Sequence, residues 1–216
     1  MQNVLVVTLY VIKRKKNKKM KKDKLGLVHV YTGDGKGKTS MSLGIALRAS
    51  GYNLSVYMIQ FLKSGDTGEL FAVENYLPNV RMVQFGKEAL IDKQMSISEF
   101  GKKTIKTNNN GRYRFLSDDE EFEPSRRALE HASKIIKSGN YDVVILDEIN
   151  NALNKKLIST KDVLEMIRDK HKNTELVLTG RNAPKEIIEV ADYVTHMGKV
   201  KHPYDKKILA REGIDY

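Results

Sequence analysis

The amino-acid sequence predicts an α/β fold in which a mostly parallel sheet is flanked by helices. Six short apolar runs alternate with segments whose apolar residues recur at helical spacing. Parallel strands are joined by crossover helices that cover both faces of the sheet, so the strands themselves are continuously apolar. Ligands bind at the carboxyl ends of such strands, where we expect the functional side chains. The runs are residues 27–31, 54–61, 80–85, 143–146, 176–178 and 193–197.

The segments between the runs alternate in the way that this fold requires. The first run leads into a glycine-rich turn and a helical pattern that ends near Gly51. The second is followed by a polar turn, residues 63–69, and a short helix. After the third run, residues 87–123 are polar and irregular, which predicts a variable loop or lid. The apolar spacing of residues 128–136 then predicts a helix ahead of the fourth run.

Length and composition limit the possible functions. At 216 residues with 40% hydrophobic content, the chain fits a single domain, residues 25–216, with a sizeable core. The absence of Cys excludes a disulfide framework, a thiolate metal site and a thiol nucleophile, and it is compatible with the cytoplasmic setting that we expect. The five His show no metal-ligand spacing.

The net charge of +11 is concentrated near the N-terminus. Residues 13–24 hold nine Lys or Arg and one Asp, so the rest of the chain is only mildly basic and nucleic-acid binding is not expected. The apolar residues 1–12 are too few to span a bilayer, and their charges follow them, unlike those of a signal peptide. We therefore expect no membrane insertion. Residues 1–24 are either a disordered basic arm that contacts an anionic partner, or they include residues translated upstream of a true start at Met20.

The most informative stretch directly follows the first run. Residues 33–40 form a glycine-rich turn that ends in Gly-Lys-Thr and leads into a helical pattern. This arrangement is typical of a phosphate-binding loop (P-loop), although Thr32 stands at the position of its first glycine. Glycines let backbone N–H groups approach phosphate oxygens, Lys38 supplies a mobile cation, and Thr39 offers a hydroxyl to Mg²⁺. The loop residues expected at the nucleotide are Gly33, Asp34, Gly35, Lys36, Gly37, Lys38, Thr39 and Ser40.

A pair of carboxylates ends the fourth run. Asp147 and Glu148 follow four apolar residues, about a hundred positions after the loop. Carboxylates opposite a P-loop can hold Mg²⁺ and orient its other ligands. The sequence therefore predicts a metal site made of Thr39, Asp147 and Glu148.

Two arginines allow alternative interpretations. Arg48 lies near the end of the helix after the P-loop, where it either complements the helix dipole or contacts a ligand. Arg181 lies in the turn after the fifth run, where it either reaches a phosphate or is an exposed turn residue.

Several segments match one known family in order and spacing. They are VYTGDGKGKTS (30–40), ALRASGYNLSVYMIQFLK (46–63), the later Gly68-Glu69, YDVVILDEINNAL (141–153), LVLTGRNAP (176–184), EVADYVTHM (189–197), VKHP (200–203) and AREGIDY (210–216). From about residue 26 to residue 216, the chain resembles the ATP:corrinoid adenosyltransferases of the CobA/CobO/BtuR type.

The resemblance implies a RecA-like P-loop fold, usually a homodimer. It implies an enzyme that transfers the 5′-deoxyadenosyl group of ATP to Co(I) of a corrinoid, either cobalamin or a precursor such as cobyrinic acid a,c-diamide, and releases triphosphate. ATP is then a co-substrate, Mg²⁺ or Mn²⁺ a cofactor, and an electron donor such as a flavoprotein a partner. This chemistry needs a stabilised triphosphate leaving group, and because cobalt is the nucleophile it needs no catalytic Ser, Cys or general base.

The resemblance also assigns expected roles to residues. Lys36 and Lys38 would stabilise the triphosphate, and Glu148, with Asp147, would serve the metal, so we expect Lys38, Lys36 and Glu148 to be catalytic. Other positions match family motifs around the nucleotide and corrinoid pocket. They are Arg48, Gln60, Lys63, Glu69, Asn150 and Arg181.

One segment departs from the family pattern. The family typically has Phe-Gly-x-Gly-Phe-x-Trp after the third strand, and its aromatic residues displace the lower axial ligand of the corrinoid. Here Phe85 and Gly86 match, but Lys-Glu-Ala-Leu-Ile follows and the protein has no Trp. Either Leu90, Ile91 or Phe100 fills the apolar role, or the chemistry on the corrin side differs.

Two other functions compete with adenosyl transfer. The protein could be a P-loop ATPase or kinase that has lost the corrin site, in which case ADP replaces triphosphate as a product. It could also have a non-catalytic role in which the basic arm binds a polyanion, and such binding weakens steeply with salt.

Overall fold

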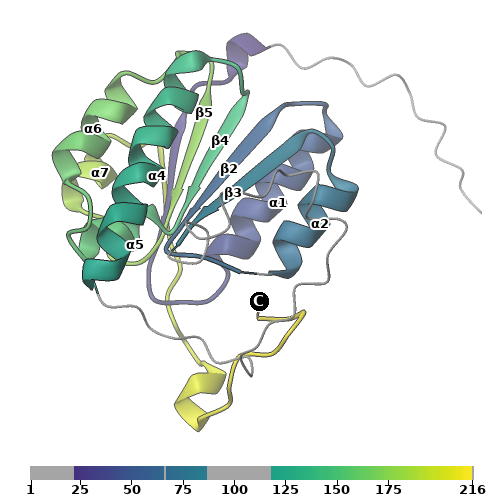
Figure 1. The fold of residues 1–216 in the computed structure, drawn as a ribbon, viewed down its shortest axis with the longest axis vertical. Coiled ribbons are helices and arrows are strands. Elements are labelled where there is room, and N and C mark those ends of the chain that lie inside the picture. The colour runs from purple at the N-terminus through teal and green to yellow at the C-terminus, as the bar shows by residue number, and fades with distance from the viewer. Residues whose placement is uncertain (1–21, 66, 87–117, 216) are drawn as a thin grey trace, which may run out of the picture.

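The computed structural model describes residues 22–65, 67–86 and 118–215, which form one α/β unit (Figure 1). Its sheet has six parallel strands in the order β3-β2-β4-β5-β1-β6. The predicted fold class is therefore confirmed, and each of the six apolar runs matches a strand whose ends differ from those of the run by two residues or fewer. The strands are β1 (Val28–Thr32), β2 (Val56–Phe61), β3 (Val80–Phe85), β4 (Val143–Asp147), β5 (Glu175–Thr179) and β6 (Tyr193–His196).

Helices cover both faces of the sheet. On each face an apolar core lies between the sheet and the helices. On one face, α1 and α2 contribute to the core that contains Met58 and Ile145. On the other, the longer α4 and the short helices α5 to α7 pack over Ile59 and Leu146. The helices are α1 (Lys38–Gly51), α2 (Gly68–Tyr76), α4 (Asp118–Ser138), α5 (Ile149–Asn154), α6 (Thr160–Arg168) and α7 (Lys185–Glu189), with short 3-10 helices η1 (Lys22–Lys24) and η4 (Pro203–Lys206).

Burial along the strands follows their position in the sheet. Every residue of the central strands β2 and β4 is buried, whereas all four residues of the edge strand β6 are exposed. Because β2 and β4 are covered on both faces, they are apolar almost throughout. The exceptions, Gln60 and Asp147, lie opposite each other in the register of β2 and β4 at the carboxyl edge.

The structure confirms one predicted helix boundary and corrects another. Helix α1 ends at Gly51 as expected, but α4 begins at Asp118, well before the apolar spacing that reveals it. Residues 118–123 therefore belong to a helix, although the sequence placed them at the end of the irregular segment; they are too polar to show apolar periodicity. Of the expected tail, residues 1–24, the first 21 lie outside the described residues, and Lys22–Lys24 form η1. Most of the expected lid, residues 87–117, also lies outside them, and so do Leu90, Ile91 and Phe100.

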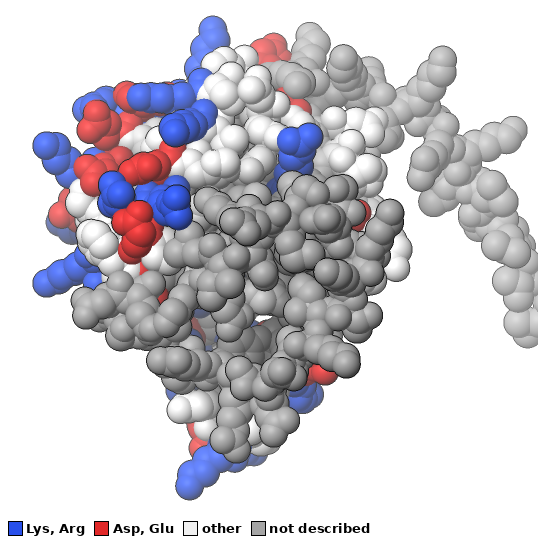
Figure 2. Space-filling model, viewed as in Figure 1, with Lys and Arg blue, Asp and Glu red and all other residues white. Residues whose placement is uncertain are grey.

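The described surface over α4 carries both signs of charge (Figure 2). Arg126 pairs with Glu123 and Glu130 at distances of 3.3 and 3.1 Å, and Lys137 pairs with Asp169 at 2.7 Å. Interleaved charges of this kind do not make a cationic stripe for a nucleic-acid backbone. Within the described ranges, no helix is both long enough and apolar enough to cross a bilayer.

The residues that directly follow β6 lie against the P-loop and form hydrogen bonds with it. Gly35 N donates to the carbonyl of Met197 at 2.8 Å, and Lys199 N donates to Asp34 Oδ1 at 3.0 Å. Gly33 has a φ of 110°, which other L residues rarely adopt, and a Cβ built on it would collide with the Met197 carbonyl oxygen. The glycine is thus required by the packing of residue 197, independently of any ligand.

We predict that Gly33→Ala destabilises the protein by more than about 2 kcal/mol, because both its φ and the Met197 carbonyl oppose a Cβ. The matched control is Gly44→Ala within α1, where a Cβ would meet no atom of the described residues within 4 Å. That variant gains helix propensity and should be stabilised by about 0.5–1 kcal/mol. Urea unfolding followed by circular dichroism measures both changes, and equal stability of the two variants would contradict the packing argument.

Candidate functional site

Four parallel strands deliver the candidate residues to one edge of the sheet. The P-loop follows β1, Lys63 follows β2, Glu148 follows β4 and Arg181 follows β5. Since all strands run in the same direction, these segments, which are far apart in the sequence, meet at their carboxyl ends. The structure brings together most of the residues that the sequence predicted for the site.

Asp147 is the centre of this arrangement. It is the last residue of β4 and fully buried, and its Oδ1 accepts a hydrogen bond from Thr179 Oγ1 at 2.7 Å. Its Oδ2 accepts from Gln60 Nε2 at 3.1 Å. Thr39 Oγ1 lies 3.1 and 3.0 Å from the two carboxylate oxygens. Residues 39 and 147, which were predicted to share a metal ion, are thus in direct contact.

Lys38 closes the P-loop on itself. Its ammonium donates to the carbonyls of Gly33 at 2.8 Å and Gly35 at 2.6 Å, and the side chain is buried. Burial lowers the pKa of Lys38, while the nearby charge of Glu148 opposes that shift. A phosphate that binds the loop can take over the hydrogen bonds that these two carbonyls now accept, because an ammonium has three donors that reorient freely.

Glu148 is held in a strained conformation beside Asp147. Its φ of 65° is left-handed, which costs a residue with a side chain about 1–2 kcal/mol. Its backbone N–H donates to Thr179 Oγ1 at 3.0 Å, whereas its buried Oε2 has no hydrogen-bond partner among the described residues. Burial, and then the charge of Asp147, raise the pKa of Glu148 against the attraction of Lys38. Strain and an unpaired buried oxygen are features that point to a ligand.

These oxygens fit a divalent cation. Mg²⁺ prefers oxygen ligands and is usually held by one or two carboxylates together with substrate phosphates. Thr39 and Asp147 present such oxygens at the N-terminus of α1, and the unpaired Oε2 of Glu148 adds another. Within the described ranges, no group of three or more His, Cys, Asp or Glu side chains is arranged to hold a metal. A cation here would therefore depend on the Thr39 hydroxyl and on phosphate oxygens as well as on the carboxylates.

A polar network extends from Asp147 toward β3. Lys63 Nζ donates to Glu69 Oε1 at 2.8 Å, and Gln60 Nε2 lies 3.3 Å from the same oxygen. Burial acts to raise the pKa of Glu69, but the charge and hydrogen bond of Lys63, together with hydrogen bonds from the Glu69 backbone and Gln60, lower that pKa overall. Gln84 Nε2 donates to Gln60 Oε1 at 2.9 Å and fixes the orientation of the Gln60 amide. Sequence analysis predicted Gln60, Lys63 and Glu69, but not Gln84.

The remaining predicted residues occupy different surroundings. Asn150 is fully buried near the start of α5, and both polar atoms of its amide have no hydrogen-bond partner in the described part of the chain. Arg181 is exposed, and its backbone N–H donates to Asn151 Oδ1 at 2.5 Å. Arg48 is exposed in the last turn of α1, about 15 Å along the helix from Lys38. Its position favours the interpretation as a complement to the helix dipole.

Lys36 and Ser40 complete the predicted set. Ser40 is exposed on the first turn of α1. Lys36 is also exposed, and its ammonium pairs with the carboxylate of Asp215 near the C-terminus. Residues that sequence analysis missed are Thr179, Gln84 and Asp215. Thr179 and Gln84 carry one detectable signal, since each is a polar residue in or directly after an apolar run.

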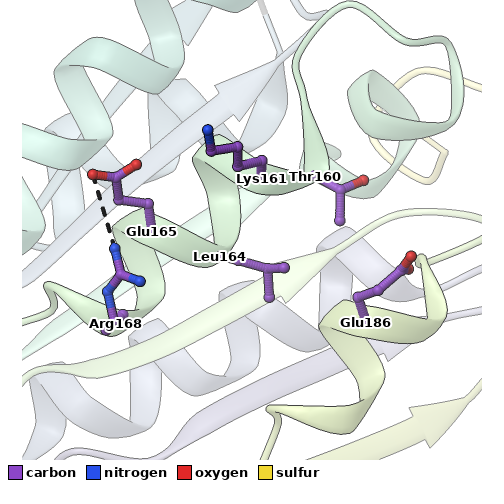
Figure 3. Close-up of a pocket in the computed structure, with 6 residues that line it drawn as sticks. All are labelled: Thr160, Lys161, Leu164, Glu165, Arg168 and Glu186. Carbon is purple, nitrogen blue, oxygen red and sulfur yellow. Dashed lines mark ion pairs between the residues drawn. The ribbon is translucent and has the colours of Figure 1, made fainter.

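A surface depression of about 360 Å³ lies between α6 and α7 (Figure 3). Arg168 and Glu165 form an ion pair at its edge, 3.9 Å apart, and Leu164 lies toward its middle. None of the residues predicted for the nucleotide lines it, so it is separate from the candidate site. Its lining residues are Thr160, Lys161, Leu164, Glu165, Arg168 and Glu186.

Comparison with known proteins assigns the chain to a family. Residues 24–216 match the model of the family described as ATP:corrinoid adenosyltransferase BtuR/CobO/CobP. The chain belongs to this family. The family resemblance inferred from the sequence is thereby confirmed, and with it the enzyme class, a transferase. The P-loop type of the family agrees with the fold of the described residues.

Named relatives resemble the chain over most of their length. A corrinoid adenosyltransferase from a Sinorhizobium species is 31% identical over 94% of this chain and 86% of its own. One from Escherichia coli K12 is 28% identical over 90% and 87%. The corrinoid adenosyltransferase CobA of Salmonella typhimurium is 27% identical over 88% and 86%.

We predict that Glu148→Gln raises the thermal stability of this adenosyltransferase-family protein at neutral pH. A carboxyl whose pKa is raised by folding favours the folded state while protonated, and this contribution is lost as the pH rises through its folded pKa. The melting temperature of the variant should therefore exceed that of the wild type by a margin that grows between pH 5 and pH 8.

The control is Glu189→Gln, at an exposed residue of α7 whose carboxylate pairs with Lys185 at 3.6 Å. Differential scanning calorimetry of the three proteins measures the margin at each pH. A margin that shrinks with rising pH would mean that Glu148 is stabilised, not penalised, in its charged form.

Proposed function

We propose that this protein transfers the 5′-deoxyadenosyl group of ATP to Co(I) of a corrinoid and releases triphosphate. The observation that carries the proposal is the contact between Thr39 and buried Asp147 at the end of a P-loop, in a member of this family. In this reaction a bond forms between cobalt and C5′, and the bond between C5′ and the triphosphate oxygen breaks. The electron pair of that bond leaves with triphosphate.

The chain supplies charge and position for the leaving group. Lys38 exchanges the carbonyls of Gly33 and Gly35 for phosphate oxygens, and the N-terminus of α1 adds its dipole. Lys36 adds a second cation at the loop. Such preorganised charge favours the transition state because it faces the oxygens on which negative charge develops.

Thr39, Asp147 and Glu148 are the residues that would hold Mg²⁺ or Mn²⁺. The cation would add positive charge to the triphosphate as it leaves. Gln60 and Thr179 orient Asp147, and Gln84 in turn orients Gln60. Lys63 and Glu69 extend this polar network. We assign buried Asn150 and exposed Arg181 to the nucleotide and corrinoid pocket.

Three further features of the proposal rest on the family resemblance. We propose that the protein works as a homodimer in the cytoplasm, that its substrate is cobalamin or a precursor, and that an electron donor such as a flavoprotein reduces the corrinoid. The interleaved charges over α4 support the expectation that nucleic acid is not a partner.

A second candidate is an ATPase or kinase that lacks the corrin site. It is favoured by one observation, the absence of Trp and of the family's aromatic pattern after Phe85 and Gly86. Both candidates share the P-loop and the carboxylates, so the products separate them.

The deciding experiment is anaerobic incubation of the protein with Mg-ATP and chemically reduced cobalamin. Light-sensitive adenosylcobalamin together with triphosphate is the expected result, read from the corrinoid absorbance and by anion-exchange chromatography. ADP and phosphate with an unchanged corrinoid would instead establish the second candidate.

In the same assay, Lys38→Ala should lower turnover by roughly 10²-fold or more, as the loss of other preorganised electrostatic donors does. The matched control is Lys185→Ala, because the ammonium of Lys185 is exposed on α7 and pairs only loosely with Glu189 at 3.6 Å. Turnover of Lys38→Ala close to that of the control would remove the P-loop from the proposed mechanism.

A further inference from the structure

The C-terminal segment contacts three consecutive residues of the P-loop. Met197 accepts a hydrogen bond from Gly35 N, and Lys199 N donates to Asp34 Oδ1. Lys36 pairs with Asp215, and its Nζ lies 3.5 Å from the carbonyl oxygen of Ile214. Residues 197–215, here called the C-terminal clamp, therefore hold the loop from the side of β6.

Hydrogen bonds within the C-terminal clamp hold the carboxylate of Asp215 in place independently of its contact with Lys36. Its Oδ2 accepts hydrogen bonds from Arg211 N at 2.9 Å and from Arg211 Nε at 3.0 Å. The backbone N–H of Asp215 donates to the Arg211 carbonyl at 2.8 Å. Oδ1 is the oxygen that faces Lys36, and only 18% of the Asp215 side chain is exposed. The clamp thus presents one preoriented acceptor to the loop.

An internal ion pair stabilises the middle of the clamp. Lys199 Nζ lies 2.9 and 3.3 Å from the two carboxylate oxygens of Asp205 in η4. The backbone of Lys199 simultaneously holds Asp34. Movement of the clamp is therefore coupled to the P-loop through both Asp34 and Lys36.

The clamp restricts the loop beside Gly37, whose φ is 110°. A Cβ built on Gly37 would meet no atom of the described residues within 4 Å, so packing in the described part of the chain does not fill this position. A free lysine side chain loses rotamer freedom when it binds a ligand, and pairing with a fixed carboxylate removes part of that freedom in advance. Because an ammonium has three donors, Lys36 can keep its bond to Asp215 and still donate to a phosphate. The positive charge of Arg211 reduces the repulsion between the Asp215 carboxylate and that phosphate.

We propose that Asp215 is a positioning residue for the triphosphate site. This inference rests on the proposed function, and it adds the C-terminal clamp to that function. Asp215 acts through Lys36: it holds the loop from Asp34 to Gly37 in the conformation that receives the triphosphate, and it contacts no substrate itself.

The test compares Asp215→Asn with Asp169→Asn. Asp169 also pairs with a lysine, Lys137, on the surface of the protein away from the loop. In Asp215→Asn we expect the Kd for Mg-ATP and for inorganic tripolyphosphate, measured by calorimetry, to rise about five- to tenfold, which corresponds to about 1–1.4 kcal/mol. The KM for ATP should rise in parallel, kcat should stay within about twofold, and Asp215→Glu should restore part of the affinity. Asp169→Asn should bind like the wild type.

Two further measurements distinguish a positioning role from a general effect on folding stability. Amide hydrogen exchange at residues 33–37 should accelerate in Asp215→Asn without a change in melting temperature. In a Lys36→Met background, Asp215→Asn should have no additional effect on Kd, since the two residues act as one unit. Unchanged Kd and exchange in Asp215→Asn would overturn the proposal, and so would tighter binding, which would make Asp215 a competitor of the triphosphate.

Failure of the proposed function gives a different result. If the wild type adenosylates neither cobalamin nor a precursor such as cobyrinic acid a,c-diamide, or binds neither Mg-ATP nor tripolyphosphate, adenosyl transfer is disproved. The exchange rates of residues 33–37 still decide whether Asp215 positions the loop, because that measurement needs no ligand.

Discussion

The burial of Asp147 is the constraint on which the rest of the site depends. A carboxylate without access to water is costly unless hydrogen bonds satisfy it. Thr39, Gln60 and Thr179 meet this need, and they come from α1, β2 and β5. Three separate parts of the sheet edge are therefore fixed relative to one another by one side chain. The same demand explains why the polar residues Gln60, within β2, and Thr179, at the end of β5, are fully buried.

The strained conformation of Glu148 follows from the same geometry. Asp147 completes β4, and the chain must turn at once to begin α5 at Ile149. The left-handed residue between them lets the chain turn without a glycine, so that a carboxylate can occupy the position. Leu62 after β2 and Asn182 after β5 also have positive φ, so sharp turns recur along this edge. The fold accepts conformational strain where it places its functional groups.

The sequence predicted the features whose cause is local. Each buried strand was recognisable because its residues are continuously apolar, and the P-loop because glycines and Lys38 occur together. Asp147 was found because it directly ends such a strand. Gln84 and Asp215 were missed because their roles depend on partners that the chain brings near only after folding. Lys36 and Asp215, for example, are 179 positions apart in the sequence. The early start of α4 was missed because its first residues are polar.

Strand β1 has a consequence for how the protein is made. It pairs with β5 and β6, and residue Val28 lies opposite Leu176. Among the described strands, β1 is the earliest in the sequence, and it therefore has no neighbour in the sheet until about four-fifths of the 216 residues have been synthesised. Until then its apolar residues and both of its edges must be kept from other chains, since unpaired strand edges promote aggregation. The nucleotide loop, although encoded early, is completed among the last parts of the molecule.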